Sequence, residues 1–166
     1  MGLFDSIFKK KSVEAASLSE KEPATRKQFK VAGTSFKKED IASLGSLNPN
    51  YRLNKKELIR AGLVDVDVYE YTFPEFDAGL LFEPDNPHDP GAIKVLADGD
   101  HVGYIKKGSC AQVRNLINGG KIKKATVLIR GGNYKYVTSL GIGEGDYELD
   151  KNSREFSVTL VVDLFE

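Results

Sequence analysis

The stretch AIKVLADGDHVGYIK, residues 92–106, decides how this part of the chain folds. Two runs of alternating apolar and polar residues flank Asp98-Gly99, a dipeptide typical of the two-residue turn of a β-hairpin. Strands joined by so short a turn are antiparallel. The stretch therefore predicts an antiparallel hairpin, with a larger sheet built outward from it.

Further strands are predicted on both sides of this hairpin. Alternating β-branched and aromatic residues predict strands at VDVDVYEYTF, residues 64–73, and at REFSVTLVVDLF, residues 154–165. Between them, Gly131-Gly132 separates ATVLIR from NYKYVTSL and predicts a second tight hairpin. Short strands joined mostly by hairpins favour a mainly β fold with short helices, either a small antiparallel barrel or a strongly bent sheet.

The chain length of 166 residues suits one domain with appendages. Residues 1–11, MGLFDSIFKKK, have apolar side chains at helical spacing followed by three lysines. This amphipathic segment is interpreted as a helix that lies on an anionic membrane surface, on a protein partner or on its own domain. Residues 12–27 are polar and are predicted to be a flexible linker. The folded domain is expected at residues 28–166.

Composition excludes several classes of function. No apolar run approaches 18 residues, so no membrane-spanning helix is expected. The only cysteine, Cys110, allows no internal disulfide, and a reducing cytoplasm is predicted. Cys110 falls on the apolar face of a predicted helix and is interpreted as a buried packing residue rather than a nucleophile. No catalytic constellation and no cofactor motif is recognised, so the protein is predicted not to be an enzyme.

Charge is distributed unevenly although the net charge is zero. Residues 65–100 contain ten acidic side chains and one basic side chain, whereas residues 101–143 contain no acidic side chain. Bases interleaved with Tyr104, Tyr134 and Tyr136 are typical of single-strand binders, in which cations hold phosphates and rings stack on bases. The alternative is that Tyr134 and Tyr136 pack in the core. The basic side chains of this second segment are Lys106, Lys107, Arg114, Lys121, Lys123, Lys124, Arg130 and Lys135.

The motif EPDNPHDP, residues 83–90, directly precedes the hairpin. Asp85, His88 and Asp89, with His101 nearby, are of the types that bind divalent ions. However, prolines restrict the loop, and acidic residues in turns usually accept hydrogen bonds from their own backbone. A rigid structural loop is therefore the favoured interpretation, and no metal site is predicted.

The run FEPDNPHDPGAIKV followed by DGDHVGYIKKGSCAQVRNLI resembles the HIRAN domain family, as does VAG at residues 31–33. The resemblance covers most of residues 28–140, with a long connection between VAG and EPDNP. It is closest in kind to stand-alone bacterial or phage HIRAN proteins. The family is an OB-like β-barrel. In eukaryotic fork-remodelling helicases it is an accessory domain that captures the 3′ end of single-stranded DNA. The resemblance therefore implies a non-catalytic DNA-binding module of replication or repair.

The resemblance also implies roles for single residues. Asp89 matches the aspartate that contacts the terminal 3′ hydroxyl, and His88 matches an aromatic position beside it. Phe36 falls where an aromatic ring stacks on a base. DNA-binding members have an arginine where this chain has Ser35, and Lys37 is a candidate substitute. The alternative function is a protein-interaction adaptor, membrane-associated through residues 1–11. The full set of predicted DNA-binding residues is Phe36, Lys37, Asn86, His88, Asp89, Tyr104, Lys106, Lys107 and Tyr134.

Overall fold

The computed structural model describes residues 25–141, 143 and 145–166. The segment at residues 1–11 and the first part of the predicted linker lie outside these residues, so their roles stay predictions. The strands are β1 (Thr25–Ala32), β2 (Ser46–Leu47), β3 (Val68–Tyr69), β4 (Tyr71–Thr72), β5 (Phe76–Phe82), β6 (Ile93–Ala97), β7 (Asp100–Ile105), β8 (Ile122–Ser139) and β9 (Tyr147–Leu164). The α-helices are α1 (Lys38–Leu44), α2 (Lys55–Arg60) and α3 (Cys110–Asn118), and the 3-10 turns are η2 (Thr34–Lys37), η3 (Pro49–Arg52) and η4 (Lys107–Ser109).

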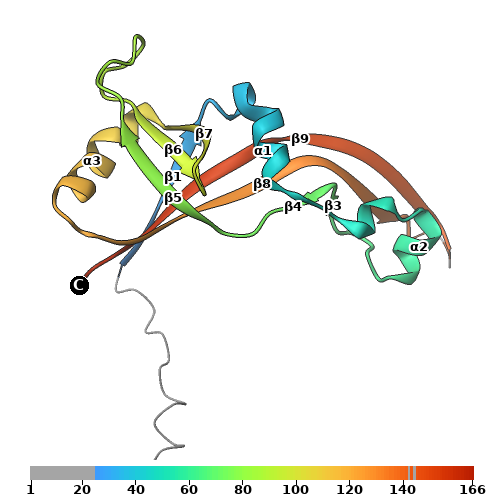
Figure 1. Ribbon diagram of the computed structural model, residues 1–166. Helices are drawn as coiled ribbons and strands as arrows, with labels where there is room; N and C mark the ends of the chain where they lie inside the picture. Colours follow the sequence, from blue (N-terminus) through green and yellow to red (C-terminus); the bar gives the residue numbers. More distant parts are fainter. Residues whose placement is uncertain (1–24, 142, 144) are drawn as a thin grey trace, which may run out of the picture.

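Seven strands form one antiparallel sheet in the order β3-β8-β5-β6-β7-β1-β9. Strand β8 also pairs with β9, which closes the six strands from β8 to β9 into a barrel (Figure 1). The prediction of a mainly β fold with short helices and a small antiparallel barrel is therefore confirmed. No helix in the described part of the chain is long and apolar enough to cross a membrane.

The hairpin predicted at Asp98-Gly99 is present as β6 and β7. Both turn residues have positive φ angles, 46° and 92°, as the tight turn requires. At the other end of the domain, β1 begins at Thr25, which pairs with Leu164. The barrel therefore starts before the boundary expected at Gln28, and residues 25–27 are strand rather than linker.

The second hairpin predicted at Gly131-Gly132 is wrong. Strands β8 and β9 are one long antiparallel pair that runs from Ile122 opposite Leu164 to Ser139 opposite Tyr147. The two glycines lie inside β8 at a register shift. A Cβ atom on Gly131 would stand 2.4 Å from the carbonyl oxygen of Glu155. The glycines are thus required by close approach of the partner backbone in a bulge, not by a chain reversal.

The single strand predicted at residues 64–73 is also wrong, because the segment divides between two partners. Val68 and Tyr69 pair with β8, whereas Tyr71 and Thr72 pair with β2. Glu70 lies between the two pairings, and its N–H donates to the carbonyl of Asn133. Alternation of apolar residues is retained, but each half of the segment belongs to a different sheet.

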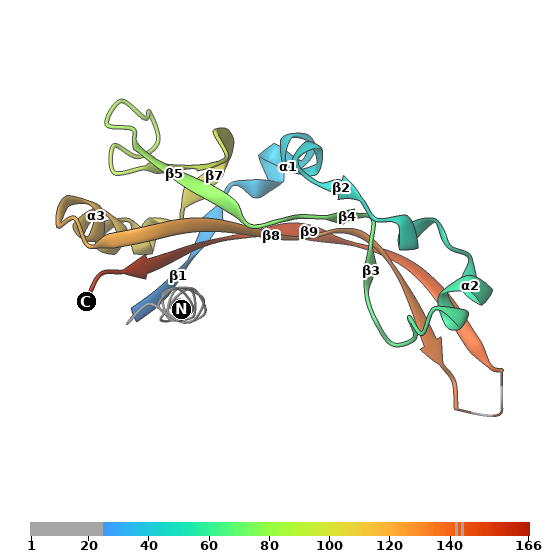
Figure 2. The same ribbon diagram turned by 60° about the horizontal axis from the view of Figure 1, so that its bottom comes forward.

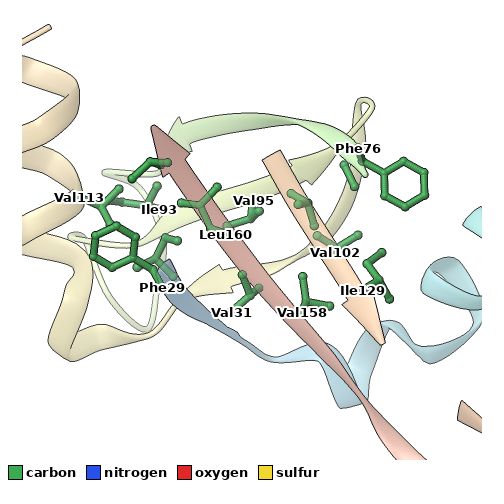
Figure 3. Close-up of a cluster of buried hydrophobic side chains, with 14 of the residues drawn as sticks. Phe29, Val31, Phe76, Ile93, Val95, Val102, Val113, Ile129, Val158 and Leu160 are labelled. Carbon is green, nitrogen blue, oxygen red and sulfur yellow. The ribbon is translucent and has the colours of Figure 1, made fainter. Parts of the chain in front are cut away.

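Two hydrophobic clusters stabilise the fold. The barrel cluster includes Phe29, Ile93, Val102 and Leu160, which lie inside the closed sheet and against α3 (Figure 3). A smaller distal cluster is centred on Leu58, Val68 and Val137. The segment from η3 to β3 forms it together with the far part of β8 and β9, which extends well beyond the barrel (Figures 1 and 2).

Candidate nucleic-acid interface

A groove with a volume of about 340 Å³ lies on the outside of the barrel. Three segments meet there: the turn η2, the loop between β5 and β6, and strand β7. Six of the nine predicted site residues line it together although they come from distant parts of the chain. The groove is lined by Gly33, Phe36, Lys37, Asn86, His88, Asp89, Ala92, His101, Gly103, Tyr104 and Ile105.

Asn86 holds the loop of the groove in shape. Its Oδ1 accepts hydrogen bonds from the N–H groups of His88 (2.9 Å) and Asp89 (3.1 Å). Its Nδ2 donates to Oε2 of Glu83 at 3.0 Å. Asn86 is therefore a scaffold residue, as the structural interpretation of EPDNPHDP expected, because its amide is used within the loop.

Asp89 lines the groove and uses one of its two carboxylate oxygens within the loop. Its Oδ1 accepts from the N–H of Gly91 at 2.8 Å, which fixes the side chain in an Asx turn. The Oδ2 atom makes no hydrogen bond with any residue the structure describes. An acceptor left open beside aromatic side chains suits a ligand that donates a proton, such as a hydroxyl group.

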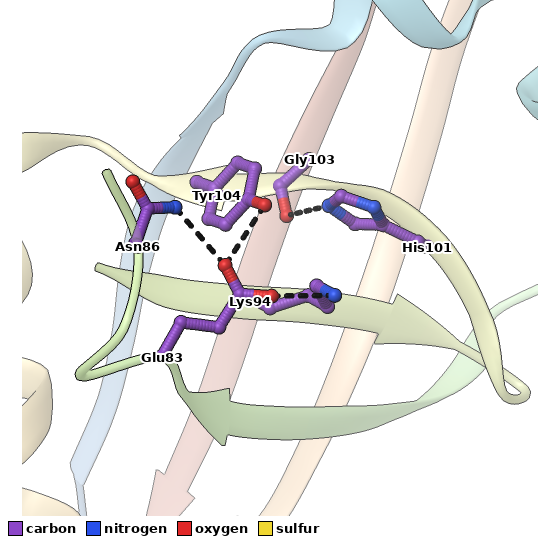
Figure 4. A network of polar contacts seen from close by, with 6 residues as sticks. All are labelled: Glu83, Asn86, Lys94, His101, Gly103 and Tyr104. Atoms are coloured by element: carbon purple, nitrogen blue, oxygen red, sulfur yellow. Dashed lines mark hydrogen bonds and ion pairs between the residues drawn. The ribbon is translucent and has the colours of Figure 1, made fainter. Parts of the chain in front are cut away.

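Glu83 joins the loop to the two strands beneath it (Figure 4). Its Oε1 lies 2.5 Å from Nζ of Lys94, and its Oε2 accepts from the hydroxyl of Tyr104 at 3.0 Å. Hydrogen bonds from Lys94, Asn86 and Tyr104 lower the pKa of Glu83 from 4.5 to about 2. The same network raises the pKa of Lys94, mainly through its hydrogen bond to Glu83. The carboxylate therefore stays ionised and locks the Tyr104 ring at the base of the groove.

Glu83→Gln is expected to flatten the acid dependence of stability. Because folding lowers the pKa of Glu83, its ionised form stabilises the fold above the ordinary pKa of 4.5, and this contribution is lost as the pH falls toward 2. Urea denaturation at pH 6 and pH 3 should show a smaller loss of stability for the variant than for the wild type. Glu148→Gln, an exposed carboxylate on β9, is the control and should behave like the wild type. Equal losses in the wild type and Glu83→Gln would contradict the network.

Phe36 and Lys37 form the wall opposite the loop. The Phe36 side chain is 90% exposed, which is unusual for a large apolar residue in a small domain. Lys37 lies 3.5 Å from the exposed carboxylate of Asp40, a pair that solvent screens and a phosphate can displace. The wall therefore offers a free ring face and a cation at the edge of the groove.

The other three predicted residues lie elsewhere. Lys106 and Lys107 follow the groove at the end of β7, and both are exposed. Tyr134 is outside the groove: its ring packs 5.4 Å from that of Tyr69, and Arg154 lies 4.5 Å above it. Tyr134 is therefore a packing residue, which was the alternative to a DNA-binding role.

The basic segment does not form one continuous patch. The Nζ atom of Lys135 donates to the carbonyl of Leu53 at 3.0 Å and lies 4.9 Å from the ring of Tyr51. Arg114 donates to the carbonyl of Gly91 at 3.0 Å and so braces the loop that bears Asp89. Part of the positive charge predicted for a polyanion is therefore used inside the protein.

Two residues that contribute to the site were missed from the sequence. His101 was considered only as a metal ligand, yet it lines the groove with its ring edge-on to Tyr104, 4.9 Å between centroids. Glu83 was recognised only as part of the motif EPDNPHDP, without a role of its own. Strict alternation along a strand would put His101 and Tyr104, three residues apart, on opposite faces, and the register shift between β6 and β7 that brings them together leaves no signal in the sequence. Within the described residues, no group of three potential ligands is arranged to hold a metal ion.

The fold and the site together define the class of protein, which is a small closed β-barrel with an open groove lined by aromatic and polar side chains. Residues 69–141 match the HIRAN domain family, which confirms the family resemblance that the motifs indicated. HIRAN domains are nucleic-acid-binding modules. No curated protein and no solved structure matched the chain. Phe36 and Lys37 precede the matched segment, and so does β1, which completes the barrel.

Proposed function

We propose that this protein is a non-catalytic module that binds single-stranded DNA and receives its 3′ end in the groove. The observation that supports this proposal is the convergence of Phe36, Lys37, Asp89 and Tyr104 around one hollow. The binding unit includes β1 and β9, because these strands close the barrel that holds the groove.

Each kind of side chain in the groove suits one part of a DNA end. The exposed ring of Phe36 is free to stack on a base, and base stacking tolerates any sequence. Lys37, two residues after Ser35, supplies the cation for a phosphate. A carboxylate repels phosphates, so Asp89 is suited to a terminal hydroxyl that donates to its open oxygen.

Asp89→Asn is expected to abolish discrimination between DNA ends. The wild type should bind an oligonucleotide with a free 3′ hydroxyl more tightly than the same oligonucleotide with a 3′ phosphate, because a phosphate would face the Asp89 carboxylate. The asparagine variant removes this repulsion and should bind both ends within about twofold. Fluorescence anisotropy at two salt concentrations measures both affinities.

The matched control for this experiment is Asp40→Asn, which removes a carboxylate near Lys37 but outside the loop. It should retain the preference for the free hydroxyl. Equal and negligible binding of both oligonucleotides by the wild type at low salt would refute the proposed function. Measurable binding with no preference for either end would refute the role of Asp89 alone.

A further inference from the structure

The ring of His101 is held in one orientation at the groove. Its Nε2 lies 3.1 Å from the carbonyl oxygen of Gly103, as Figure 4 shows. Its ring meets that of Tyr104 edge to face, with an interplanar angle of 86°. Two contacts of different kinds thus fix the ring before any ligand binds, and Tyr104 is itself fixed by Glu83.

These contacts determine which nitrogen of His101 carries the proton. A carbonyl oxygen can only accept a hydrogen bond, so Nε2 must be the protonated nitrogen. Burial, with smaller contributions from the cations of Lys37 and Lys94, lowers the pKa of His101 below its ordinary 6.5. The ring is therefore neutral at pH 7, although Glu83 also faces it, and Nδ1 has a lone pair and no proton.

The Nδ1 atom makes no hydrogen bond with the part of the chain that the structure describes. A neutral acceptor gives a phosphate oxygen nothing to bind, because that oxygen is also an acceptor. The partner that fits must donate an N–H or O–H, which the bases of a nucleic acid offer on their edges.

We propose that His101 selects among bases in the groove by accepting, at Nδ1, a hydrogen bond from an exocyclic amino group such as that of adenine or cytosine. This inference rests on the proposed function, because it needs a nucleotide in the groove. It adds base preference to a site whose stacking and hydroxyl contacts are indifferent to sequence.

The test uses oligonucleotides that differ only in the amino group. The three 3′-terminal nucleotides are deoxyadenosine or purine deoxyriboside, which lacks the 6-amino group. A second pair has deoxycytidine or its 4-deamino analogue. Fluorescence anisotropy with the full-length protein should show about 3- to 10-fold tighter binding of each amino-bearing strand, the range for one hydrogen bond.

Three variants identify His101 as the source of this difference. His101→Phe keeps a ring against Tyr104 but removes the acceptor, so it should bind both members of each pair equally. His101→Gln keeps a donor and an acceptor and should restore part of the difference. Asn152→Ala alters an exposed polar residue of β9 outside the groove and should leave the difference intact. Thermal denaturation reports whether each variant is folded.

Other results would overturn the inference. Wild-type binding without any difference between amino-bearing and deaminated strands refutes the role of His101 and leaves the proposed function standing. If His101→Phe retains the difference between the two strands, the role of His101 is likewise refuted and the proposed function stands. The same conclusion follows if His101→Phe loses a preference for a 3′-terminal ribonucleotide but not the difference between the two strands, because the group that donates to His101 would then be the 2′ hydroxyl. Absence of binding to every oligonucleotide refutes the proposed function and the inference with it.

Discussion

Gly103→Ala should lower the free energy of unfolding by about 2–4 kcal/mol, a large effect for a single methyl group. Gly103 has a φ angle of 151°, a conformation that side-chain-bearing residues rarely adopt. A Cβ atom there would stand 2.4 Å from the carbonyl oxygen of Ala32 and 2.7 Å from Cγ1 of Val31. Strand β1 would have to move away from β7, which opens the barrel below the groove. Urea denaturation measures the change.

Gly108→Ala is the matched control. Gly108 lies in η4, and a Cβ atom there meets nothing within 4 Å. Its substitution should change the stability by less than about 0.5 kcal/mol, as for most surface positions. If Gly103→Ala were as stable as Gly108→Ala, the close packing of β1 on β7 would be refuted.

Phe36→Ala should weaken binding of single-stranded DNA by about 5- to 100-fold, which corresponds to the loss of one stacked base. The ring is 90% exposed, so its removal costs little folding energy and the variant should unfold like the wild type. A large loss of affinity with unchanged stability is expected only if the ring meets a ligand. Anisotropy and urea denaturation of the same sample measure the two quantities.

Leu47→Ala is the control for exposed apolar surface. Leu47 is 54% exposed but lies in β2, and it does not line the groove. It should bind DNA as the wild type does. If Phe36→Ala and the wild type bound DNA with equal affinity, the Phe36 ring would not stack on a base. The aromatic wall of the groove would then not be a binding element.

Local turn chemistry made part of this fold predictable. Asp98-Gly99 predicted β6 and β7 correctly because its positive φ angles are needed by the turn itself. Gly131-Gly132 has positive φ angles as well, but there the cause is the backbone of Glu155 on another strand. A long-range cause of this kind leaves no local signal, so a bulge was taken for a turn.

The candidate site was predictable where the family resemblance supplied the residues. It placed Asp89 and Phe36, which the structure brings to one groove although the residues are far apart in the sequence. His101 was missed because the sequence shows it only as a lone histidine that follows two acidic turn residues and precedes a buried valine. A histidine in such a position has several interpretations. Only the register of β6 and β7 shows that it stands beside Tyr104 on the outer face.

From the two separate hydrophobic clusters we expect two cooperative unfolding units in this molecule rather than one. Between them the ribbon of β8 passes through Gly131 and Gly132, which carry no side chains that could link the clusters. Local unfolding proceeds in such contiguous units. We therefore expect the distal cluster to open to solvent while β7, the loop and η2 keep their places, so that local unfolding at the far end of β8 and β9 leaves the geometry of the groove unchanged.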